Sequence, residues 1–511
     1  MNHSQPREIP SRVARGEIAA VPLGARICSD EDLPYGETFL RQFVIDTRPV
    51  AVPSNWRHAT LGARTLWHCP ELPLMRLVDD AGEVVGLVLG IALIAGAGMV
   101  ADGTRVPCTP DALERWIENV AGRYIVLTDN RLYVDPSCSL TPFFDPTTGR
   151  IAASVPLAID RPLADSPDLP LSLFRAERGR YYFFGDTVDA TVQRMMANHY
   201  LDLSQYRQVR HWPRDDTDFT QPASHSDQVD AICDRLTQVL EVLIGSNRCA
   251  LPITGGQDSR FLLGCCHHRL SDLASLYCWV RNEATFVDAL LAETIAERLQ
   301  HPLLTISCAG PTAEAIGDAD VERIARMIDL RSSFQYAPDA RSIRAHQMAP
   351  PGDLILRGGL IELMRANKWR VAWGTQVTPE LGLRALSMPT LQPDDFKARS
   401  EPRYGAWLDG LPEAAKTRAA DLGHCEIWMP TTQSMISAGY ANRTIVYGAN
   451  DRELLRMIMC MTYPVRRGNR PQRQMERWRL PMLQGVPYRD RTLSKAVHGS
   501  GLFEKLGRAT G

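Results

Sequence analysis

The residues with the clearest potential for chemistry form one short run in the middle of the chain, Leu251–Arg260, which reads LPITGGQDSR. Its apolar lead-in is typical of a strand, and the FLLGCC that follows is typical of the start of a helix. Gly255 and Gly256 would let the backbone approach an anion closely, and amides at a helix N-terminus donate to phosphate oxygens. Because Asp258 would repel a bare phosphate, its presence favours a divalent cation between the two, with Mg²⁺ as the usual choice.

Two other interpretations of this run have to be weighed. It is not a Walker A motif, because no Gly-Lys-Ser or Gly-Lys-Thr follows the glycines. An ordinary glycine turn, capped by Asp258 and Ser259 for structural reasons alone, is the alternative.

The elements around this run alternate between helices and strands. Apolar residues at helical spacing follow a Ser and Asp start signal over Ser226–Gly245 and predict a long helix. The segments that follow are CALPI as a strand, FLLGCC as a helix start, SLYCWV as a strand, TFVDALLAETIAERL as a helix and PLLTIS as a strand. This order predicts a parallel sheet with helices on its faces, in which ligands bind beyond the carboxyl ends of the strands.

The first part of the chain has a different pattern. Up to about residue 155 it reads as short strands and turns, such as RQFVIDTR, GEVVGLVLGIALI, GRYIVLTDNRLYVD and GRIAASVPLAI. Residues 160–220 are irregular and rich in Pro, Asp and Arg, as a connecting region would be. We therefore expect two domains, residues 1–220 and residues 221–511.

Composition and charge narrow the class of protein. Of the 511 residues 44% are hydrophobic, which is ordinary for a globular protein, and the formal net charge of −2 gives no global field to recruit nucleic acid. Twelve scattered cysteines without a CxxC pair favour thiols in a reducing cytoplasm over disulfides or a zinc site. Val84–Val100 holds 17 uncharged residues, at the short edge of the transmembrane range. Glycines interrupt it, so we expect a buried strand and turn in a cytoplasmic protein without a membrane partner.

TGGQDS after an apolar strand closely resembles the SGGxDS pyrophosphate loop of the asparagine synthetase family, with Thr254 in place of the usual Ser. In that family the loop binds the β- and γ-phosphates of ATP, which leave as pyrophosphate when a carboxylate is adenylated. Other segments resemble the family in the same order, namely Gly122–Pro156, Asn198–Leu203 with Trp212-Pro213, and the helix that carries Asp288 and Ala292. The resemblance implies that ATP and Mg²⁺ are cofactors and that the pyrophosphate loop is formed by Thr254, Gly255, Gly256, Gln257, Asp258 and Ser259.

The N-terminal half departs from the family in one respect that matters. The family's glutaminase half uses an N-terminal Cys, exposed once Met1 is removed, as its nucleophile. Here residue 2 is Asn and the first cysteine is Cys28. Without a free α-amine beside the thiol, that chemistry has no base. We therefore expect a glutaminase-like sandwich of the N-terminal-nucleophile type that does not hydrolyse glutamine, so that the nitrogen comes from ammonia or from an amine on the substrate.

A second acidic loop is also altered. Asparagine synthetases carry a GDGxDE-like segment, and its best counterpart here is LILRGGLIELMRANKWR, Leu354–Arg370, whose only acid is Glu362. The resemblance implies that Glu362 completes a Mg²⁺ site with Asp258, beside Gly358 and Gly359. Arg365 and Arg357 would neutralise charge on the leaving pyrophosphate. The alternative is that Glu362 and Arg365, at i and i+3, simply pair on a helix surface.

The C-terminal part is mostly helical in pattern. Ile436–Cys460 resembles the family's acceptor-side segment, with Arg443 and Asp451 at matching places. Family members often place a lysine further on, where it stabilises the acyl-transfer transition state. Lys495 is the nearest candidate for that role, and a plain surface lysine is the alternative. The arginine-rich run between them would be a solvated face, a nucleic-acid patch or a contact to an acidic substrate.

Together these features predict an α+β and α/β protein with an adenine nucleotide alpha-hydrolase-like C-terminal domain. The expected activity is an AMP-forming carbon–nitrogen ligase that adenylates a small-molecule or peptide carboxylate. Family members that lack the N-terminal Cys include β-lactam synthetases and lasso peptide cyclases, which favours amide formation on a peptide or specialised metabolite. A cyclase of that type would need a leader-peptide protease as a partner. An asparagine synthetase that uses ammonia and a non-catalytic ATP-binding scaffold are the alternatives.

Overall fold

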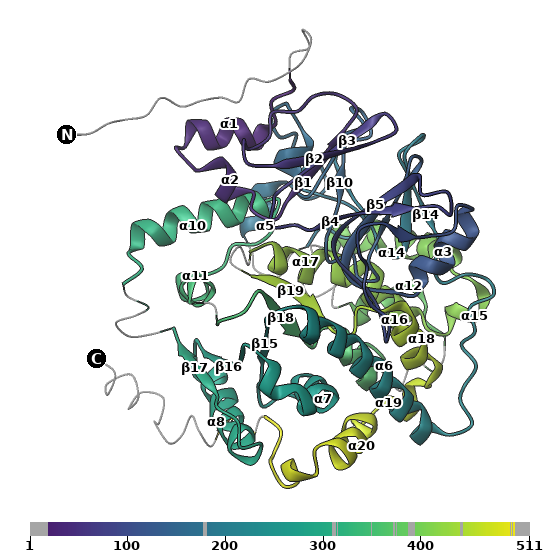
Figure 1. The fold of residues 1–511 in the computed structure, drawn as a ribbon, viewed down its shortest axis with the longest axis vertical. Helices are drawn as coiled ribbons and strands as arrows, with labels where there is room; N and C mark the ends of the chain where they lie inside the picture. Colours follow the sequence, from purple (N-terminus) through teal and green to yellow (C-terminus); the bar gives the residue numbers. More distant parts are fainter. Residues whose placement is uncertain are drawn as a thin grey trace.

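The structure, a computed structural model, describes most of the chain. The described residues are 19–176, 181–308, 313, 315–348, 350–370, 374, 376–386, 394–439, 443–490, 492 and 494–495, with side chains left out at 394–397. The fold is a mixture of helices and three sheets, so the expected mixed α and β class is confirmed at that level. In Figure 1 the two N-terminal sheets lie together at the top and right, and the parallel sheet lies below them.

Two largely antiparallel sheets form the N-terminal half. The first has six strands in the order β12 (Gln193–Arg194), β10 (Phe143–Phe144), β11 (Ile151–Ala152), β1 (Phe43–Asp46), β3 (Arg64–His68) and β2 (Arg57–Leu61). The second runs β14 (Arg207–Arg210), β13 (His199–Asp202), β9 (Arg131–Val134), β8 (Val120–Leu127), β5 (Val84–Ile94), β4 (Leu74–Val78) and β7 (Thr104–Arg105), with β6 (Gly98–Met99) on β5. Phe43 and Ile45 of the first sheet share one buried cluster with Leu89 and Ile125 of the second, so the two sheets pack face to face.

The C-terminal half contains a five-stranded parallel sheet, which confirms the prediction made from the alternating pattern. Its strand order is β17 (Leu304–Ser307), β16 (Ser275–Val280), β15 (Cys249–Pro252), β18 (Leu354–Arg357) and β19 (Thr444–Tyr447). In the described part of the chain, the α-helices are α1 (Leu23–Asp30), α2 (Tyr35–Thr38), α3 (Pro110–Glu118), α4 (Val155–Ala158), α5 (Leu171–Ala176), α6 (His225–Ser246), α7 (Gln257–Cys266), α8 (Glu283–Arg298), α10 (Asp318–Arg331), α11 (Ala340–Gln347), α12 (Pro379–Ala385), α14 (Asp394–Asp409), α15 (Glu413–Lys416), α16 (Ala419–Gly423), α17 (Met429–Gly439), α18 (Arg452–Cys460), α19 (Tyr463–Arg466) and α20 (Arg470–Arg479). Shorter turns are the 3₁₀ helices η1 (His267–Asp272), η2 (Ile361–Arg365) and η5 (Pro481–Leu483) and the π-helical turn η4 (His424–Trp428).

Two local predictions are wrong. The segment GRIAASVPLAI was expected to be one strand, but its strand ends at Ala152 and Val155–Ala158 forms the short helix α4. Pro156 lies in the first turn of that helix, where its missing N–H costs nothing. The segment 160–220 was expected to be irregular, but β13 and β14 form within it and extend the second sheet beyond β9. The predicted domain boundary near residue 220 lies between β14 and α6.

The apolar stretch Val84–Val100 is a buried strand followed by a turn, as expected. It forms β5, whose residues from Gly86 to Leu93 are buried and which pairs with β8 along eight positions. Gly90 lies at φ +109, and a Cβ there would come within 2.3 Å of the Arg123 carbonyl oxygen, so only glycine fits this close approach. Among the described residues, no helix has both the length and the apolar character needed to cross a membrane.

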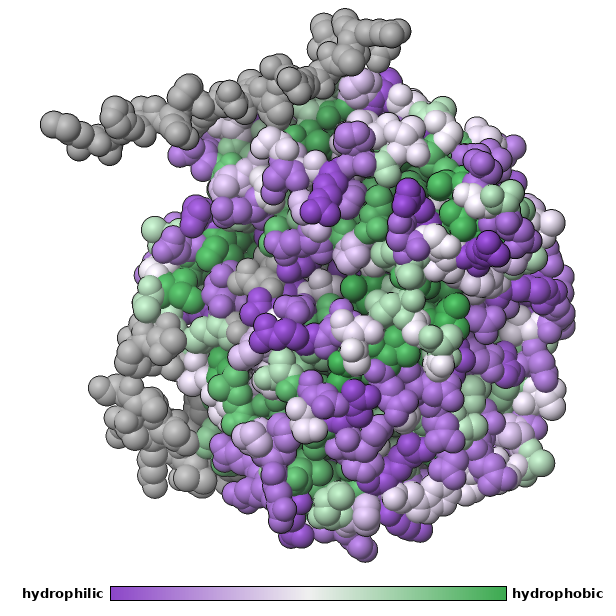
Figure 2. Space-filling model, in the orientation of Figure 1, coloured by the Kyte–Doolittle hydropathy of each residue, from purple (hydrophilic) through white to green (hydrophobic). Residues whose placement is uncertain are grey.

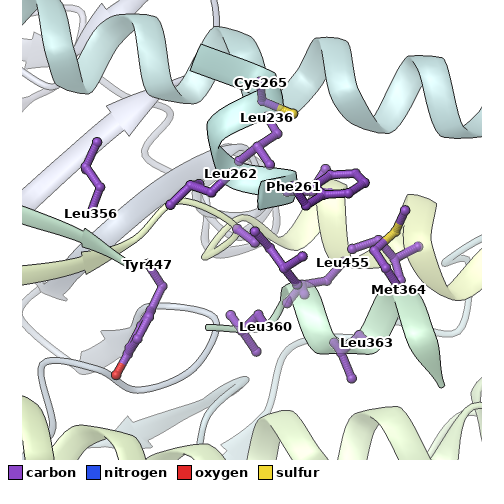
Figure 3. Packing of buried hydrophobic residues seen from close by; sticks show 14 of the residues in the cluster. Leu236, Phe261, Leu262, Cys265, Leu356, Leu360, Leu363, Met364, Tyr447 and Leu455 are labelled. Carbon is purple, nitrogen blue, oxygen red and sulfur yellow. The ribbon is translucent and has the colours of Figure 1, made fainter. Parts of the chain in front are cut away.

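The core of the C-terminal half lies between the parallel sheet and its helices. The helix α7 is buried along FLLGCC because it lies under α6, and Leu236 of α6 packs near Phe261 and Cys265 of α7 (Figure 3). Leu360 and Met364 of the loop after β18 belong to the same cluster. On the outer face polar side chains predominate, with smaller apolar areas between them (Figure 2).

Buried polar contacts join the two halves. The Asn450 side-chain amide donates to the Gly122 carbonyl oxygen at 2.6 Å and to the Asp135 carboxylate at 2.7 Å. The guanidinium of Arg452, which is fully buried, donates to the Val134 carbonyl oxygen at 2.7 Å. These contacts fix the turn after β19 against β8 and β9.

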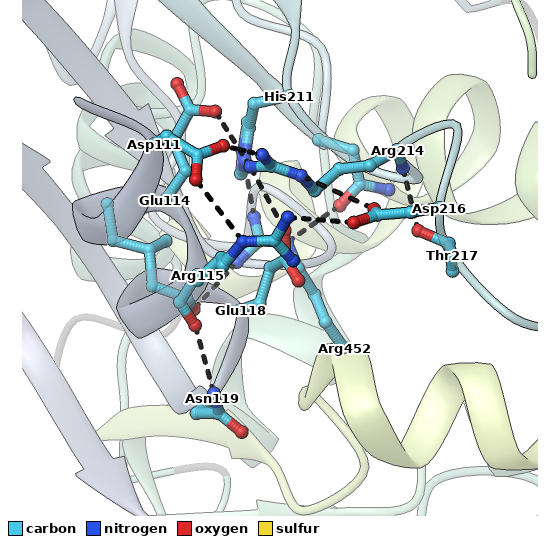
Figure 4. Close-up of polar contacts among 12 residues, drawn as sticks. Asp111, Glu114, Arg115, Glu118, Asn119, His211, Arg214, Asp216, Thr217 and Arg452 are labelled. Atoms are coloured by element: carbon cyan, nitrogen blue, oxygen red, sulfur yellow. Dashed lines mark hydrogen bonds and ion pairs between the residues drawn. The ribbon is translucent and has the colours of Figure 1, made fainter. Parts of the chain in front are cut away.

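The connection that leads from β14 to α6 is fastened to α3 by ion pairs (Figure 4). Arg115 of α3 lies 2.8 Å from Asp216, and Arg214 lies 3.2 Å from Glu114. The Arg115–Asp216 pair is exposed, and such a pair contributes about 0–1 kcal/mol, so it positions the connection more than it stabilises the fold.

Candidate functional site

The strand order of the parallel sheet creates a crevice between β15 and β18. From β15 the chain crosses by α7 to β16 on one side, whereas β18 joins β15 on the other side. In open parallel sheets ligands bind at such a switch point, beyond the carboxyl ends of the strands. The two loops singled out in the sequence are the ones that follow β15 and β18, so the fold brings both to this crevice.

The turn after β15 is held in shape by its own side chains. The hydroxyl groups of Thr254 and Ser259 lie 2.9 Å apart, and the Gly256 amide donates to the Thr254 hydroxyl oxygen at 3.2 Å. The helix α7 then begins at Gln257, and the amides of its first turn have no acceptor within the helix. These amides point beyond the end of β15 and are suited to an anion.

One of the predicted anion donors is used elsewhere. The Gly255 amide donates to the Asp288 carboxylate of α8 at 3.0 Å, and the carbonyl oxygen of Gly255 accepts from the Arg489 amide at 2.8 Å. The guanidinium of Arg489 also pairs with Asp288. Gly255 therefore anchors the turn instead of binding phosphate, and a Cβ at this position would lie 2.3 Å from Leu291.

Asp258 has one carboxylate oxygen in use and one without a partner. Its Oδ2 accepts from the Arg365 guanidinium at 2.6 Å, whereas its Oδ1 is buried and makes no hydrogen bond with the described residues. Burial raises the pKa of Asp258 to about 6; the Arg365 charge opposes this rise and the Glu362 charge adds to it. A buried carboxylate oxygen without a donor is costly, and a bound cation would remove that cost.

The loop after β18 approaches Asp258 closely enough to require glycine. A Cβ on Gly358 would lie 3.1 Å from the Asp258 carbonyl oxygen, and a Cβ on Gly359 would lie 2.5 Å from the Tyr447 ring. Gly359 thus faces β19, whereas Gly358 faces the predicted loop. The turn η2 that follows is bracketed by Leu360 at φ 74 and Ala366 at φ 48, two non-glycine residues in the left-handed region. Such strain costs about 1–3 kcal/mol per residue and is concentrated at functional sites.

Glu362 does not pair with Arg365, so the surface-pair alternative does not hold. Its carboxylate accepts a hydrogen bond from His424 Nε2 at 2.8 Å, whereas the Arg365 guanidinium donates to Asp258. Burial raises the pKa of Glu362, but the His424 hydrogen bond and charge outweigh it and hold the pKa below its ordinary value. His424 opens the π-helical turn η4, a type of irregularity that is frequent at functional sites. Periodicity in the sequence gives no sign of this turn, so His424 was missed.

A lysine other than the predicted one lies close to Glu362. The Lys368 ammonium lies 4.3 Å from the centre of the Trp428 ring, and burial lowers its pKa while the charge of Glu362 opposes that shift. Lys495 is exposed near the end of the described residues, and none of the contacts above involves it. From the same C-terminal segment, Arg489 is the residue that reaches the loop after β15.

The residues at matching places in the acceptor-side segment have other roles. Both carboxylate oxygens of Asp451 are occupied, one by the Glu453 and Leu454 amides at the start of α18 and the other by Arg235 at 2.7 Å. Arg443 donates to the Pro350 carbonyl oxygen at 3.3 Å and lies at a different cavity. Neither residue contacts Asp258 or Glu362.

The donor set at the crevice fits a magnesium ion that is shared with a phosphate ligand. In the described part of the chain, no three His, Cys, Asp or Glu side chains are grouped so that they could hold a metal by themselves. Mg²⁺ is usually held by one or two carboxylates, with its remaining positions filled by phosphate oxygens and water. Two carboxylates are available at the crevice, Asp258, whose Oδ1 has no partner among the described residues, and Glu362.

The N-terminal half has no evident nucleophile at its first cysteine. Cys28 is buried, and burial raises the pKa of its thiol to about 11, so the thiolate is scarce at neutral pH. Asn2 lies outside the described residues.

Comparison with known proteins gives no family for this chain. No model in a scan of protein families matches it, and a search of curated proteins finds no match. The resemblance to the asparagine synthetase family therefore stays a prediction from the residues themselves.

Proposed function

We propose that the chain is an ATP-dependent, AMP-forming carbon–nitrogen ligase with its active site in the crevice between β15 and β18. The observation that carries the proposal is the meeting of two loops there, because Asp258 of one loop lies against Gly358 and Arg365 of the other and keeps one oxygen without a partner. The resemblance of TGGQDS to a pyrophosphate loop and the crevice geometry point to the same ligand, a nucleoside triphosphate.

In this proposal the first step is adenylation of a carboxylate. A carboxylate oxygen of the substrate attacks the α-phosphorus of ATP, and the bond between that phosphorus and the α,β-bridging oxygen breaks to release pyrophosphate. The first-turn amides of α7 and the hydroxyl of Ser259 hold the departing phosphates, and Arg365 balances their charge. Mg²⁺, when bound, would neutralise phosphate charge. Asp258 and Glu362 would hold it.

The second step forms the amide. An amine nitrogen attacks the acyl carbon of the acyl-adenylate, the carbon–oxygen bond to AMP breaks, and the amine loses a proton. Glu362 and His424 form a hydrogen-bonded pair and would take that proton. Lys368 adds a positive charge on the same side of the crevice.

The substrate class follows from the N-terminal half. Because Cys28 is buried and burial raises the pKa of its thiol to about 11, we propose that this half supplies no ammonia from glutamine and that the amine is carried by a peptide or a specialised metabolite, as in lasso peptide cyclases. An asparagine synthetase that uses free ammonia is the nearest alternative within the same chemistry. The two alternatives are distinguished by the source of the amide nitrogen in the product, which is ammonium in one case and the substrate amine in the other.

A non-catalytic ATP-binding subunit is the second candidate, and one observation favours it. Arg365 already pairs with Asp258 at 2.6 Å, and a guanidinium in that place lowers the need for a metal ion. The two proposals differ in one respect, because an enzyme converts ATP to AMP and a binding subunit does not.

The test is an assay of AMP, pyrophosphate and hydroxamate with ATP, Mg²⁺, hydroxylamine and a panel of carboxylates that includes acidic peptides. Carboxylate-dependent AMP with a trapped hydroxamate, lost in Asp258→Asn, is the expected result. Asp353→Asn is the matched control, because Asp353 is an exposed aspartate just before β18, at the opposite edge of the same sheet. ATP binding without AMP for any carboxylate or peptide would favour the binding subunit.

A further inference from the structure

A second polar cavity lies between the two halves, away from the crevice. Its free volume is about 30 Å³, and it is bordered by β1, β8 and the segment after β9 on one side and by α10 and α17 on the other. Among the described residues that line it are four arginines and no aspartate or glutamate, and the arginines are Arg41, Arg123, Arg331 and Arg443. A cavity lined in this way carries a concentrated positive charge.

Arg331 is the member whose charge has the least compensation. Its side chain is at the C-terminal end of α10 and is only 2% exposed, and its Nε and Nη1 atoms make no hydrogen bond with the described residues. Burial and the nearby Arg41 charge lower the pKa of Arg331 to about 10, which still leaves the guanidinium cationic at neutral pH. A buried cation without a partner is among the most costly groups a protein can hold.

The other arginines line the same cavity and are held in place by further contacts. Arg123 is buried and donates through Nε to the Ser139 carbonyl oxygen at 3.1 Å. Its nearest acid is Asp135, which already accepts from Asn450 and from the Leu140 amide. Arg41 pairs with the half-exposed Glu71 outside the cavity lining.

Among the described residues, the neutral groups of the lining accept no hydrogen bond from Nε or Nη1 of Arg331. The hydroxyls of Thr141, Ser434 and Ser437 donate to carbonyl oxygens at 2.6–2.8 Å. The Gln42 amide donates to the Arg331 carbonyl oxygen and its oxygen accepts from Ser154. What the cavity lacks is an anion.

We propose that this cavity binds one small carboxylate-type anion, of the size of formate or bicarbonate, which bridges Arg331 to Arg41 and Arg123 of the N-terminal half. The forked guanidinium group matches a planar carboxylate through paired N–H donors. The volume admits a ligand of a few heavy atoms and excludes a nucleotide or a peptide. The site is independent of the proposed ligase activity, because none of its residues belongs to the crevice.

The anion would also tie the two halves together. Arg331 and Arg443 come from the C-terminal half, whereas Arg123 lies on β8 and Arg41 lies in the turn before β1. A bound anion turns repulsion between these two pairs into attraction, so it stabilises their association as any ligand of the native state does.

Formate is the probe that tests the proposal. Equilibrium dialysis of the full chain against labelled formate, in a buffer with a bulky sulfonate as the only other anion, is expected to give one saturable site per chain that saturating Mg²⁺–ATP does not displace. The melting temperature of the protein is expected to rise by about 1–3 °C when formate saturates the site. No saturable formate site in the wild type would overturn the proposal.

Variants locate the site. Arg331→Met is expected to weaken formate binding at least tenfold and to raise the melting temperature in formate-free buffer, because it removes an uncompensated buried charge. Arg150→Met is the matched control, since Arg150 is equally buried but paired with Asp46 at 2.8 Å, and it is expected to lower the melting temperature and leave formate binding unchanged. If Arg331→Met is not recovered folded, the milder Arg331→Gln takes its place with the same expected loss.

Two further anions define the chemistry. Chloride carries the same charge without the planar oxygens and is expected to bind at least tenfold more weakly than formate. Chloride that binds as tightly as formate would overturn the carboxylate assignment and make this a halide site. Phosphate that displaces formate with equal affinity would contradict the size limit.

Discussion

Two turns at the carboxyl edge of the parallel sheet invite comparison. The turn after β15 and the turn after β19 each lead from a buried strand into a helix, and each carries an aspartate that meets an arginine from a distant part of the chain. Asp451 is completely buried, and its two oxygens are filled by backbone amides and by Arg235. Asp258 is 29% exposed, and one of its oxygens has no partner among the described residues.

The difference separates an acid that builds the fold from one that is available to a ligand. Beside Asp451, the side chains of Asn450 and Arg452 donate to backbone carbonyl oxygens of the N-terminal sheets. Around Asp258 the neighbours Arg365 and Glu362 form a half-satisfied group at a switch point. The same strand–turn–helix arrangement therefore serves structure at one place and is open to chemistry at the other.

The largest expected effect is on activity at Asp258. Asp258→Asn keeps the shape and removes the charge, and AMP formation is expected to fall about 10²–10³-fold, as for the loss of one key electrostatic group. Because burial raises the pKa of Asp258 to about 6, the carboxylate that forms above that pH lowers the stability of the folded state relative to the unfolded chain. The variant is expected to be more stable than the wild type at pH 7.5, by up to about 3 kcal/mol in urea unfolding. Loss of both activity and stability would make Asp258 a structural acid like Asp451.

The second prediction concerns Asp451. Asp451→Ala leaves Arg235 without its partner and removes the cap of α18, so the free energy of unfolding is expected to fall by about 3 kcal/mol. The measurement is urea unfolding followed by circular dichroism. Molecules that remain folded are expected to bind Mg²⁺–ATP as the wild type does. Weaker binding in that folded fraction would place Asp451 in the site.

A smaller effect is expected at Glu362. Glu362→Gln keeps an acceptor for His424 and removes one charge from the metal pair, so the affinity for Mg²⁺ in the presence of ATP is expected to fall about tenfold. This affinity is measured from the rate of AMP formation at a series of Mg²⁺ concentrations. An unchanged Mg²⁺ requirement would leave Asp258 as the sole protein ligand and assign Glu362 to proton transfer with His424.

The smallest effect is a dependence on pH. Asp258 must be ionised to hold a cation, so Mg²⁺-dependent ATP binding is expected to weaken as the pH falls through about 6, approaching tenfold per pH unit below it. The stability of the protein moves in the opposite direction, because a carboxyl group with a raised pKa favours the folded state more as it becomes protonated. Calorimetric titrations at pH 5 and pH 7.5 measure the binding change, and Asp258→Asn is expected to show none.

The sequence predicts the strands and turns that form the site better than the distant side chains that contact it. The parallel sheet, the turn after β15 and the glycine turn after β18 follow from patterns of a few neighbouring residues, which local physics controls. The partners are set by packing over long separations. Arg365 meets Asp258 across 107 residues, His424 meets Glu362 across 62, and Arg489 reaches Asp288 across 201.

Local sequence patterns do not reveal contacts that depend on the packing of distant segments. Lys495 was chosen for its place in the chain, but Lys368, which has no distinguishing pattern, lies beside Glu362. Gly255 looks like an anion donor in the motif, yet its amide is taken by Asp288. The four arginines of the second cavity come from four separate segments, so no single window of sequence reveals them.

Calorimetric titration of ATP, with and without Mg²⁺, into the wild type, Asp258→Asn and Asp353→Asn tests the central claim most directly. The predicted result is one ATP per chain, bound at least tenfold more tightly with Mg²⁺ in the wild type and in Asp353→Asn, and without that Mg²⁺ dependence in Asp258→Asn. Absence of ATP binding, or binding that neither Mg²⁺ nor the Asp258 charge affects, would contradict the account.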